Sequence, residues 1–300
     1  MSVFTGLSAF PLTPLHRDRV DEASFAALIR RLHSAGVDSI TALGSTGSYA
    51  YLDGAERDHV AQLAVEHAAG TPVFIGVGDL RTSRVLARID GAQAAGASGV
   101  LLAPLSYQRM NDEEVFGLFA AASAHSELPI IIYDNPGTTH FNFSPQLYAR
   151  IAQLQNIASI KIPGVPADPA AAREHVQSLR DALPRRVSLG VSQDALAAAG
   201  LLAGCDGWYS VIGGILPHLA LHLTRLAQSG QQAAALAESE RLAPLWELFA
   251  RFGGSIRVVA AIAELLGLAP ADCLPYPIQG LDGAQRAEVA RVLQLLELEG

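Results

Sequence analysis

The chain has 300 residues, of which 50% are hydrophobic, 17% are charged and 6% are aromatic, and its formal net charge is −8. This length and apolar content allow one domain with a large core, and the acidic balance argues against a nucleic-acid partner. No apolar run approaches the ~18 residues of a membrane span, and no signal peptide is recognisable at the start. We therefore expect a cytoplasmic protein that has no membrane partner.

Short apolar runs alternate with longer amphipathic segments over most of the chain. Strands that are buried on both faces read as continuous apolar runs in parallel sheets, and the loops between them are marked by glycine or proline. Strands are expected at 6–12, 39–45, 72–78, 99–104, 129–135, 158–163, 187–192 and 207–212. Helices are expected between them at about 21–35, 54–69, 81–95, 112–126, 144–153, 169–182, 194–203 and 216–229.

Eight such strand–helix units are the number that closes a (β/α)8 TIM barrel. The alternative, a doubly wound open sheet, usually has fewer strands, and no G-x-G-x-x-G motif follows the first strand. The sequence therefore predicts an α/β fold with a barrel catalytic domain over residues 1–229. Residues 230–300 are predicted to form a C-terminal helical extension packed on the barrel, with helices at 231–252, 255–267 and 282–298.

Lys161 is the only lysine of the chain, and it lies within the apolar run 158–163. Burial lowers the pKa of a lysine and produces neutral amine, which can attack a ketone to give a Schiff base. Arginine cannot replace it because the guanidinium stays protonated. A chance lysine would more readily fall on a helix face or in a loop, so we interpret Lys161 as a nucleophile at the carboxyl end of a barrel strand.

Other candidate site residues also follow strands. Tyr133 ends the strand that precedes that of Lys161, where it is either a proton shuttle or a core tyrosine with a satisfied hydroxyl. The loop 44–48 offers the hydroxyls of Ser45 and Thr46, and Gly47 lets backbone amides approach a carboxylate. Ser210, at the end of the last strand, is a further candidate for contact with substrate.

These segments together resemble the dihydrodipicolinate synthase / N-acetylneuraminate lyase family. Its G-T-T-G-E loop is similar to 44–48, its Y-N-x-P segment to 133–136, and its I-K-x-x-x-G lysine strand to the run around Lys161. The resemblance covers essentially the whole chain. It implies a (β/α)8 barrel with C-terminal helices, assembled as a homotetramer or homodimer, that uses no metal and no organic cofactor.

The resemblance also implies roles for these residues. Lys161 would form the Schiff base with pyruvate or another 2-oxo acid, Tyr133 would move protons, and Ser45 and Thr46 would bind the carboxylate and relay protons. Some members place a second tyrosine in the site of a neighbouring subunit. Tyr107 is the corresponding candidate, although the spacing of its motif differs by one residue.

Three departures from the family pattern concern the second substrate. Thr138 stands where dihydrodipicolinate synthases carry an arginine that holds a carboxylate, and a threonine cannot form such a bidentate contact. Ser48 replaces a glutamate, and the segment 192–194 replaces a glycine–aspartate pair. We therefore expect a Schiff-base lyase or aldolase that acts on a 2-oxo acid and an aldehyde in an altered pocket, to which Thr138 contributes.

Three alternatives remain open. The first is dihydrodipicolinate synthase of lysine biosynthesis itself, the second is a dehydratase of sugar acids, and the third is a non-catalytic barrel that binds a 2-oxo acid. The sequence does not identify the aldehyde.

Overall fold

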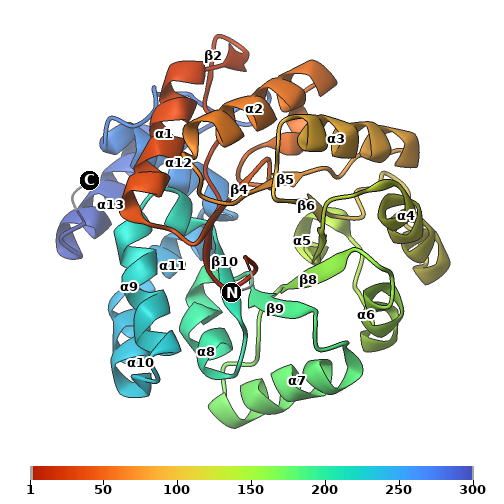
Figure 1. Ribbon diagram of the computed structural model, residues 1–300. Coiled ribbons are helices and arrows are strands. Elements are labelled where there is room, and N and C mark those ends of the chain that lie inside the picture. Colours follow the sequence, from red (N-terminus) through yellow and green to blue (C-terminus); the bar gives the residue numbers. More distant parts are fainter. Residues whose placement is uncertain (1–2, 299–300) are drawn as a thin grey trace.

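The computed structural model describes residues 3–298, and its centre is a closed barrel of parallel strands (Figure 1). Strand β1 pairs with both β10 and β4, which closes the sheet and excludes the open alternative. The predicted (β/α)8 barrel is thus confirmed. Its strands are β1 (Gly6–Ala9), β4 (Ser39–Ala42), β5 (Val73–Gly76), β6 (Gly99–Leu102), β7 (Ile130–Tyr133), β8 (Ile157–Ile162), β9 (Ser188–Val191) and β10 (Gly207–Ser210).

The helices that connect the strands form a ring around the barrel (Figure 1). They are α1 (Glu22–Ala35), α2 (Gly54–His67), α3 (Thr82–Ala94), α4 (Asp112–His125), α6 (Pro145–Ala152), α7 (Pro169–Ala182), α8 (Ala197–Leu202) and α9 (Pro217–Gln228). Some short elements were not predicted from the sequence. They are the hairpin β2 (Leu15–His16) and β3 (Arg19–Val20), the helix α5 (Pro136–Thr139), and the 3-10 turns η1 (Tyr49–Tyr51) and η3 (Ile212–Gly214). The helix predicted over 194–203 consists of the 3-10 turn η2 (Asp194–Leu196) followed by α8.

Alternating residues of the strands face opposite sides of the barrel wall. On β7, Ile130 and Ile132 pack with the helices in the main core, whereas Ile131 and Tyr133 belong to a separate cluster inside the barrel. The period of two that strands impose on side chains explains this division. On β8 the same alternation places Lys161 on the inner face, beside Tyr133 in the strand register.

Four helices follow the barrel: α10 (Gln232–Arg241), α11 (Ala243–Arg251), α12 (Ser255–Leu265) and α13 (Gly283–Leu295). The prediction of a single helix over 231–252 is wrong, because the chain turns at Leu242 and begins a new helix with Pro244 in its first turn. Proline has no amide hydrogen to donate and its ring clashes with the preceding turn, so it starts a helix readily but does not continue one.

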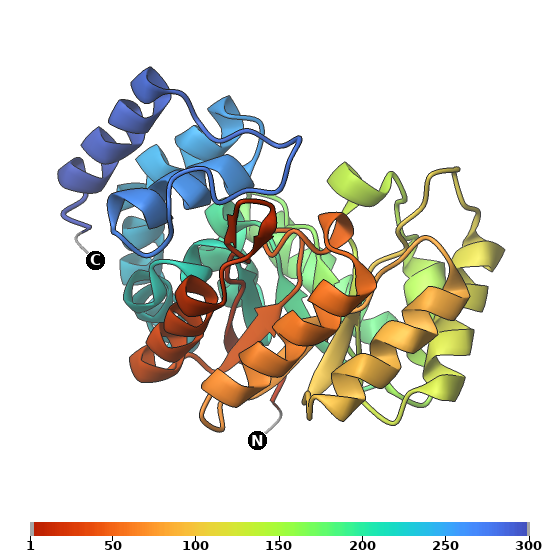
Figure 2. The same ribbon diagram turned by 90° about the horizontal axis from the view of Figure 1, so that it is seen from above.

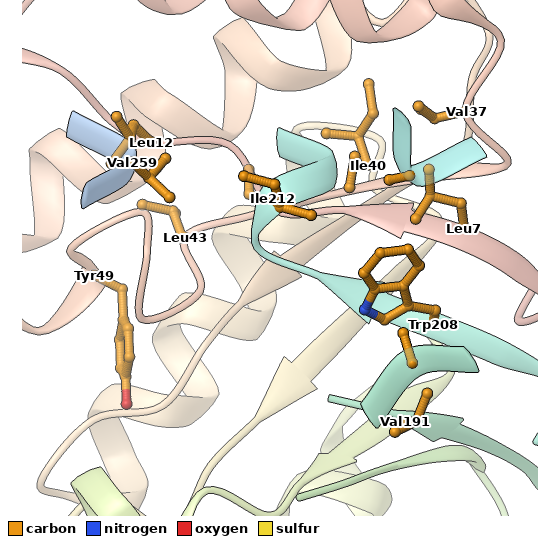
Figure 3. Packing of buried hydrophobic residues seen from close by; sticks show 14 of the residues in the cluster. Leu7, Leu12, Val37, Ile40, Leu43, Tyr49, Val191, Trp208, Ile212 and Val259 are labelled. Atoms are coloured by element: carbon orange, nitrogen blue, oxygen red, sulfur yellow. The ribbon is translucent and has the colours of Figure 1, made fainter. Parts of the chain in front are cut away.

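The C-terminal helices, drawn in blue, form a group at one side of the barrel (Figure 2). Val259 of α12 lies against Leu12 and Leu43 of the barrel loops, and all three are buried (Figure 3). On another side of the same core, Trp208 packs between Leu7 and Val191. The helical extension therefore shares its hydrophobic core with the barrel. Within residues 3–298, no helix is both long and apolar enough to cross a bilayer.

Candidate active site

A cavity of about 850 Å³ lies where the barrel strands end. Loops that follow β4, β7, β9 and β10 form part of its wall, and α11 and α12 of the C-terminal extension form another part. Active-site groups of TIM barrels lie at this carboxyl end of the strands. The wall residues that carry polar side chains relevant to chemistry are Ser45, Thr46, Ser48, Tyr49, Tyr133, Asn135, Thr138, Lys161, Ser192, Asp194, Trp246 and Arg257.

Lys161 reaches this cavity from the end of β8, and only 1% of the residue is exposed. Its amine donates a hydrogen bond to the hydroxyl of Ser192. Nζ also lies 4.6 Å from the ring centre of Tyr133 and 4.8 Å from that of Phe10. Burial lowers the pKa of Lys161 to about 7, although the negative charge of Asp194 partly opposes this shift. A large fraction of the amine is therefore neutral, and able to attack a carbonyl, near pH 7.

The phenol of Tyr133 is held in a cluster of three polar side chains. Its oxygen lies 3.2 Å from the hydroxyl of Ser45 and accepts a hydrogen bond of 2.8 Å from Asn135 Nδ2. Asn135 also donates to Ser45 at 3.3 Å. Burial raises the pKa of Tyr133, and its hydrogen bonds with Ser45 and Asn135 partly counteract this shift. The phenol therefore stays protonated at neutral pH and lies next to the lysine, where it can pass protons through Ser45.

The loop after β4 is a tight turn that presents hydroxyls to the cavity. Leu43 and Ser48 both have positive φ, at 57° and 56°. A Cβ on Gly47 would lie 3.0 Å from the amide nitrogen of Leu43, so glycine permits this close approach. Ser45 and Thr46 line the cavity, whereas Gly47 is absent from its described wall. Gly47 therefore contributes to the shape of the turn and does not line the cavity.

Three other predicted site residues have different surroundings. Thr138 lines the cavity, and its hydroxyl donates to the carbonyl oxygen of Asn135 at 3.4 Å. Tyr107 is 90% exposed and is not part of the described cavity wall. Ser210 is fully buried, and its hydroxyl donates to Asp194 and accepts from the amide of Gly213. The structure thus places Ser210 behind the cavity wall, where it supports Asp194.

Asp194 is a buried carboxylate that the sequence analysis did not single out as a site residue. It accepts hydrogen bonds from Trp208 Nε1 at 2.9 Å, from Ser210 at 3.2 Å, and from the amides of Val211 and Ile212 at 3.2 and 2.8 Å. Burial raises its pKa to about 6, although the hydrogen bonds from Trp208, Val211 and Ile212 and the charge of Lys161 partly oppose this shift. At neutral pH, Asp194 therefore supplies a fixed negative charge that favours a cation at Lys161.

The fold and the cavity together define a class of protein: a (β/α)8-barrel enzyme with a buried, partly neutral amine beside a phenol. A family model described as the dihydrodipicolinate synthetase family matches residues 3–296. The chain therefore belongs to this family, and it is a lyase of the Schiff-base type, as the sequence predicted.

Individual relatives agree with this assignment. The 4-hydroxy-tetrahydrodipicolinate synthase of Methylococcus capsulatus is 32% identical over 235 residues, which cover 78% of this chain and 79% of that protein. An Escherichia coli K12 protein named "Putative 2-dehydro-3-deoxy-D-gluconate aldolase" is 28% identical over 302 residues, covering 99% and 98% of the two chains. The crystal structure of a dihydrodipicolinate synthase from Agrobacterium tumefaciens matches with a TM-score of 0.94, 43% identity and 98% coverage of both chains.

Proposed function

We propose that Lys161 forms an imine with pyruvate, or with a related 2-oxo acid, and that the derived enamine makes or breaks a carbon–carbon bond with an aldehyde. The observation that carries this proposal is the only lysine of the chain, buried at the cavity with its pKa lowered to about 7. The neutral amine adds to the ketone carbon, water leaves, and a protonated imine remains. Asp194 stabilises this cation by its charge.

The imine then withdraws electrons from the neighbouring carbon, which loses a proton to give the enamine. In the synthetic direction, the enamine carbon attacks the aldehyde and the aldehyde oxygen takes up a proton. Water finally hydrolyses the imine and restores the lysine. Tyr133 moves these protons together with Ser45, and the hydroxyls of Ser45 and Thr46 hold the carboxylate of the 2-oxo acid.

A second candidate is dihydrodipicolinate synthase itself, which the names of several relatives at about 30% identity favour. The reaction proposed above is the more general one, and Thr138 is the reason for preferring it. The side chain at this position of the cavity wall cannot clamp a carboxylate as an arginine does. Comparing kcat/KM for aspartate semialdehyde with that for 4-oxobutanoate, which has the same chain and carboxylate but no amino group, decides between the two. A preference of more than about 100-fold for aspartate semialdehyde would favour the synthase.

Trapping with borohydride tests the imine directly. When the protein is incubated with pyruvate and sodium borohydride, we expect its intact mass to increase by one reduced pyruvyl group. Peptide mapping should locate the group at Lys161, because the chain has no other lysine and only the N-terminal amine can compete. A protein that stays unmodified, or that is modified only at its N-terminus, would refute the proposed function.

The lowered pKa of Lys161 predicts how imine formation depends on pH. Only the neutral amine attacks pyruvate, so the initial rate of trapping at low pyruvate should rise with pH and level off above about pH 8. The midpoint should lie near pH 7, because burial brings the pKa of Lys161 to about 7. Stopped-flow mixing with pyruvate at a series of pH values measures this. A rate that keeps increasing up to pH 10 would mean that the amine has an ordinary pKa.

We also propose a cytoplasmic homotetramer or homodimer, in which residues 230–300 complete the site of the catalytic barrel 1–229. The wall residues contributed by α11 and α12 support this role of the C-terminal helices. The exposed Tyr107 supports the oligomer, since in an assembly it could reach the site of a neighbouring subunit. Sedimentation velocity tests the oligomer, and a monomer at micromolar concentration would contradict it.

A further inference from the structure

We propose that Arg257 binds a carboxylate of the aldehyde partner, so that the C-terminal helix α12 takes over the recognition that Thr138 cannot provide. This inference rests on the proposed function and names its second substrate as an aldehyde acid. Among residues 3–298, Arg257 is the only arginine on the cavity wall. Once Lys161 is engaged as the neutral enamine, the guanidinium of Arg257 is the cation that remains for an incoming anion.

The contacts of Arg257 hold the side chain but leave its binding groups free. Nε donates to the carbonyl oxygen of Gln279 at 3.0 Å. Within the described chain, the two terminal nitrogens have no hydrogen bond, and no carboxylate lies within ion-pair distance of them. A guanidinium held in this way offers a preorganised pair of donors that matches a carboxylate.

Two further donors on the same wall lack partners among the described residues. Trp246 Nε1 is a buried donor without an acceptor, and Trp246 comes from α11, the helix before Arg257. The hydroxyl of Ser48 is also unpaired, although only 2% of this residue is exposed. Buried polar groups are normally hydrogen-bonded, so these groups indicate a ligand rich in acceptors.

Asp194 is the only carboxylate among the described wall residues, and it is already hydrogen-bonded. The carboxylate of Asp194 accepts hydrogen bonds from two side chains and two amides, which leaves it little capacity for a ligand. On the side formed by α11 and α12, the polar side chains are Trp246, Ser255 and Arg257, and none of them is a carboxylate. Since Trp and Arg can only donate, the complementary group is an anion rather than a second donor.

The backbone at the start of α12 adds to this preference. Gly253, Gly254 and Ser255 line the cavity, and Gly254 precedes the helix without a side chain that could cap it. The first amides of a helix have no partner within the helix, and its dipole favours a negative charge at this end. The guanidinium of Arg257 and these amides would therefore act on the same anionic group.

Equilibrium binding to the borohydride-reduced pyruvyl enzyme tests the inference, because the reduced adduct cannot form the enamine that would attack the probe. The probes are 4-oxobutanoate and 5-oxopentanoate, each compared with its methyl ester by isothermal titration calorimetry. We expect at least one acid to bind about tenfold more tightly than its ester. In Arg257→Gln this preference should fall below about threefold, and Arg257→Lys should retain part of it.

Two controls separate the possible failures. Arg291→Gln removes the same charge from an exposed position on α13, and it should keep the full preference for the acid. The pyruvyl adduct itself should form equally in all variants. If the wild type gives no adduct, the proposed function fails and the inference falls with it.

If the adduct forms but no acid binds better than its ester, or if Arg257→Gln leaves the ratio unchanged, the inference alone is overturned. Glyceraldehyde 3-phosphate, compared with glyceraldehyde, forms a further arm. A larger Arg257-dependent preference in that pair would overturn the assignment of a carboxylate in favour of a phosphate.

Discussion

Lys161→Arg should abolish the exchange of the methyl protons of pyruvate for deuterium, a reaction that requires the enamine but no aldehyde. We expect the exchange rate to fall by about 10⁵-fold or more, to the uncatalysed level, as when an enzyme loses its nucleophile. The arginine keeps the positive charge but cannot form an imine, because it does not lose its proton. Proton NMR in deuterated water measures the rate without knowledge of the acceptor.

A double variant provides the matched control. Lys161→Arg combined with Arg291→Lys again has one lysine, but at an exposed position of α13. This amine keeps an ordinary pKa near 10, so it is almost fully protonated at pH 7 and should restore neither exchange nor borohydride trapping. Substantial exchange in either variant would show that another group carries the reaction, and it would remove Lys161 from its proposed role.

The barrel and the position of Lys161 could be predicted because they depend on local patterns. Parallel strands buried on both faces leave continuous apolar runs in the sequence, and their alternation with helices fixes the topology. The same reasoning places Tyr133 and Lys161 on neighbouring strands, and the register confirms that they lie side by side. The break at Leu242 was missed, since a helical pattern continues through it and Pro244 alone marks the new start.

Much of the cavity wall could not be predicted because it depends on tertiary packing. Arg257 and Trp246 lie in amphipathic helices, and no local pattern shows which side of these helices meets the strand ends. Ser210 and Asp194 illustrate the same point. Ser210 ends one barrel strand and Asp194 follows another, but the donors that surround Asp194 come from β10 and the turn after it, and Ser210 is one of them. Asn135 could have been found, since it lies two residues after Tyr133 in a motif that was recognised.

Tyr133→Phe should separate imine formation from proton transfer. The variant keeps Lys161 and its surroundings, so borohydride should still trap a pyruvyl adduct. Exchange of the methyl protons should slow by about 10²- to 10⁴-fold, the usual contribution of a general acid–base group. The loss of the hydrogen bonds to Ser45 and Asn135 should lower the free energy of unfolding by only about 1 kcal/mol, which urea denaturation can measure.

Tyr49→Phe is the matched control, because Tyr49 is a second buried phenol on the same cavity wall but is not part of the hydrogen-bonded cluster of Ser45, Tyr133 and Asn135. Its effect on exchange should stay below about tenfold, since a lost wall contact disturbs binding more than proton transfer. The pair of variants decides between the two readings of Tyr133. If Tyr133→Phe exchanges as fast as Tyr49→Phe, Tyr133 is a core tyrosine with a satisfied hydroxyl, and the proton must move through Ser45, Thr46 or water.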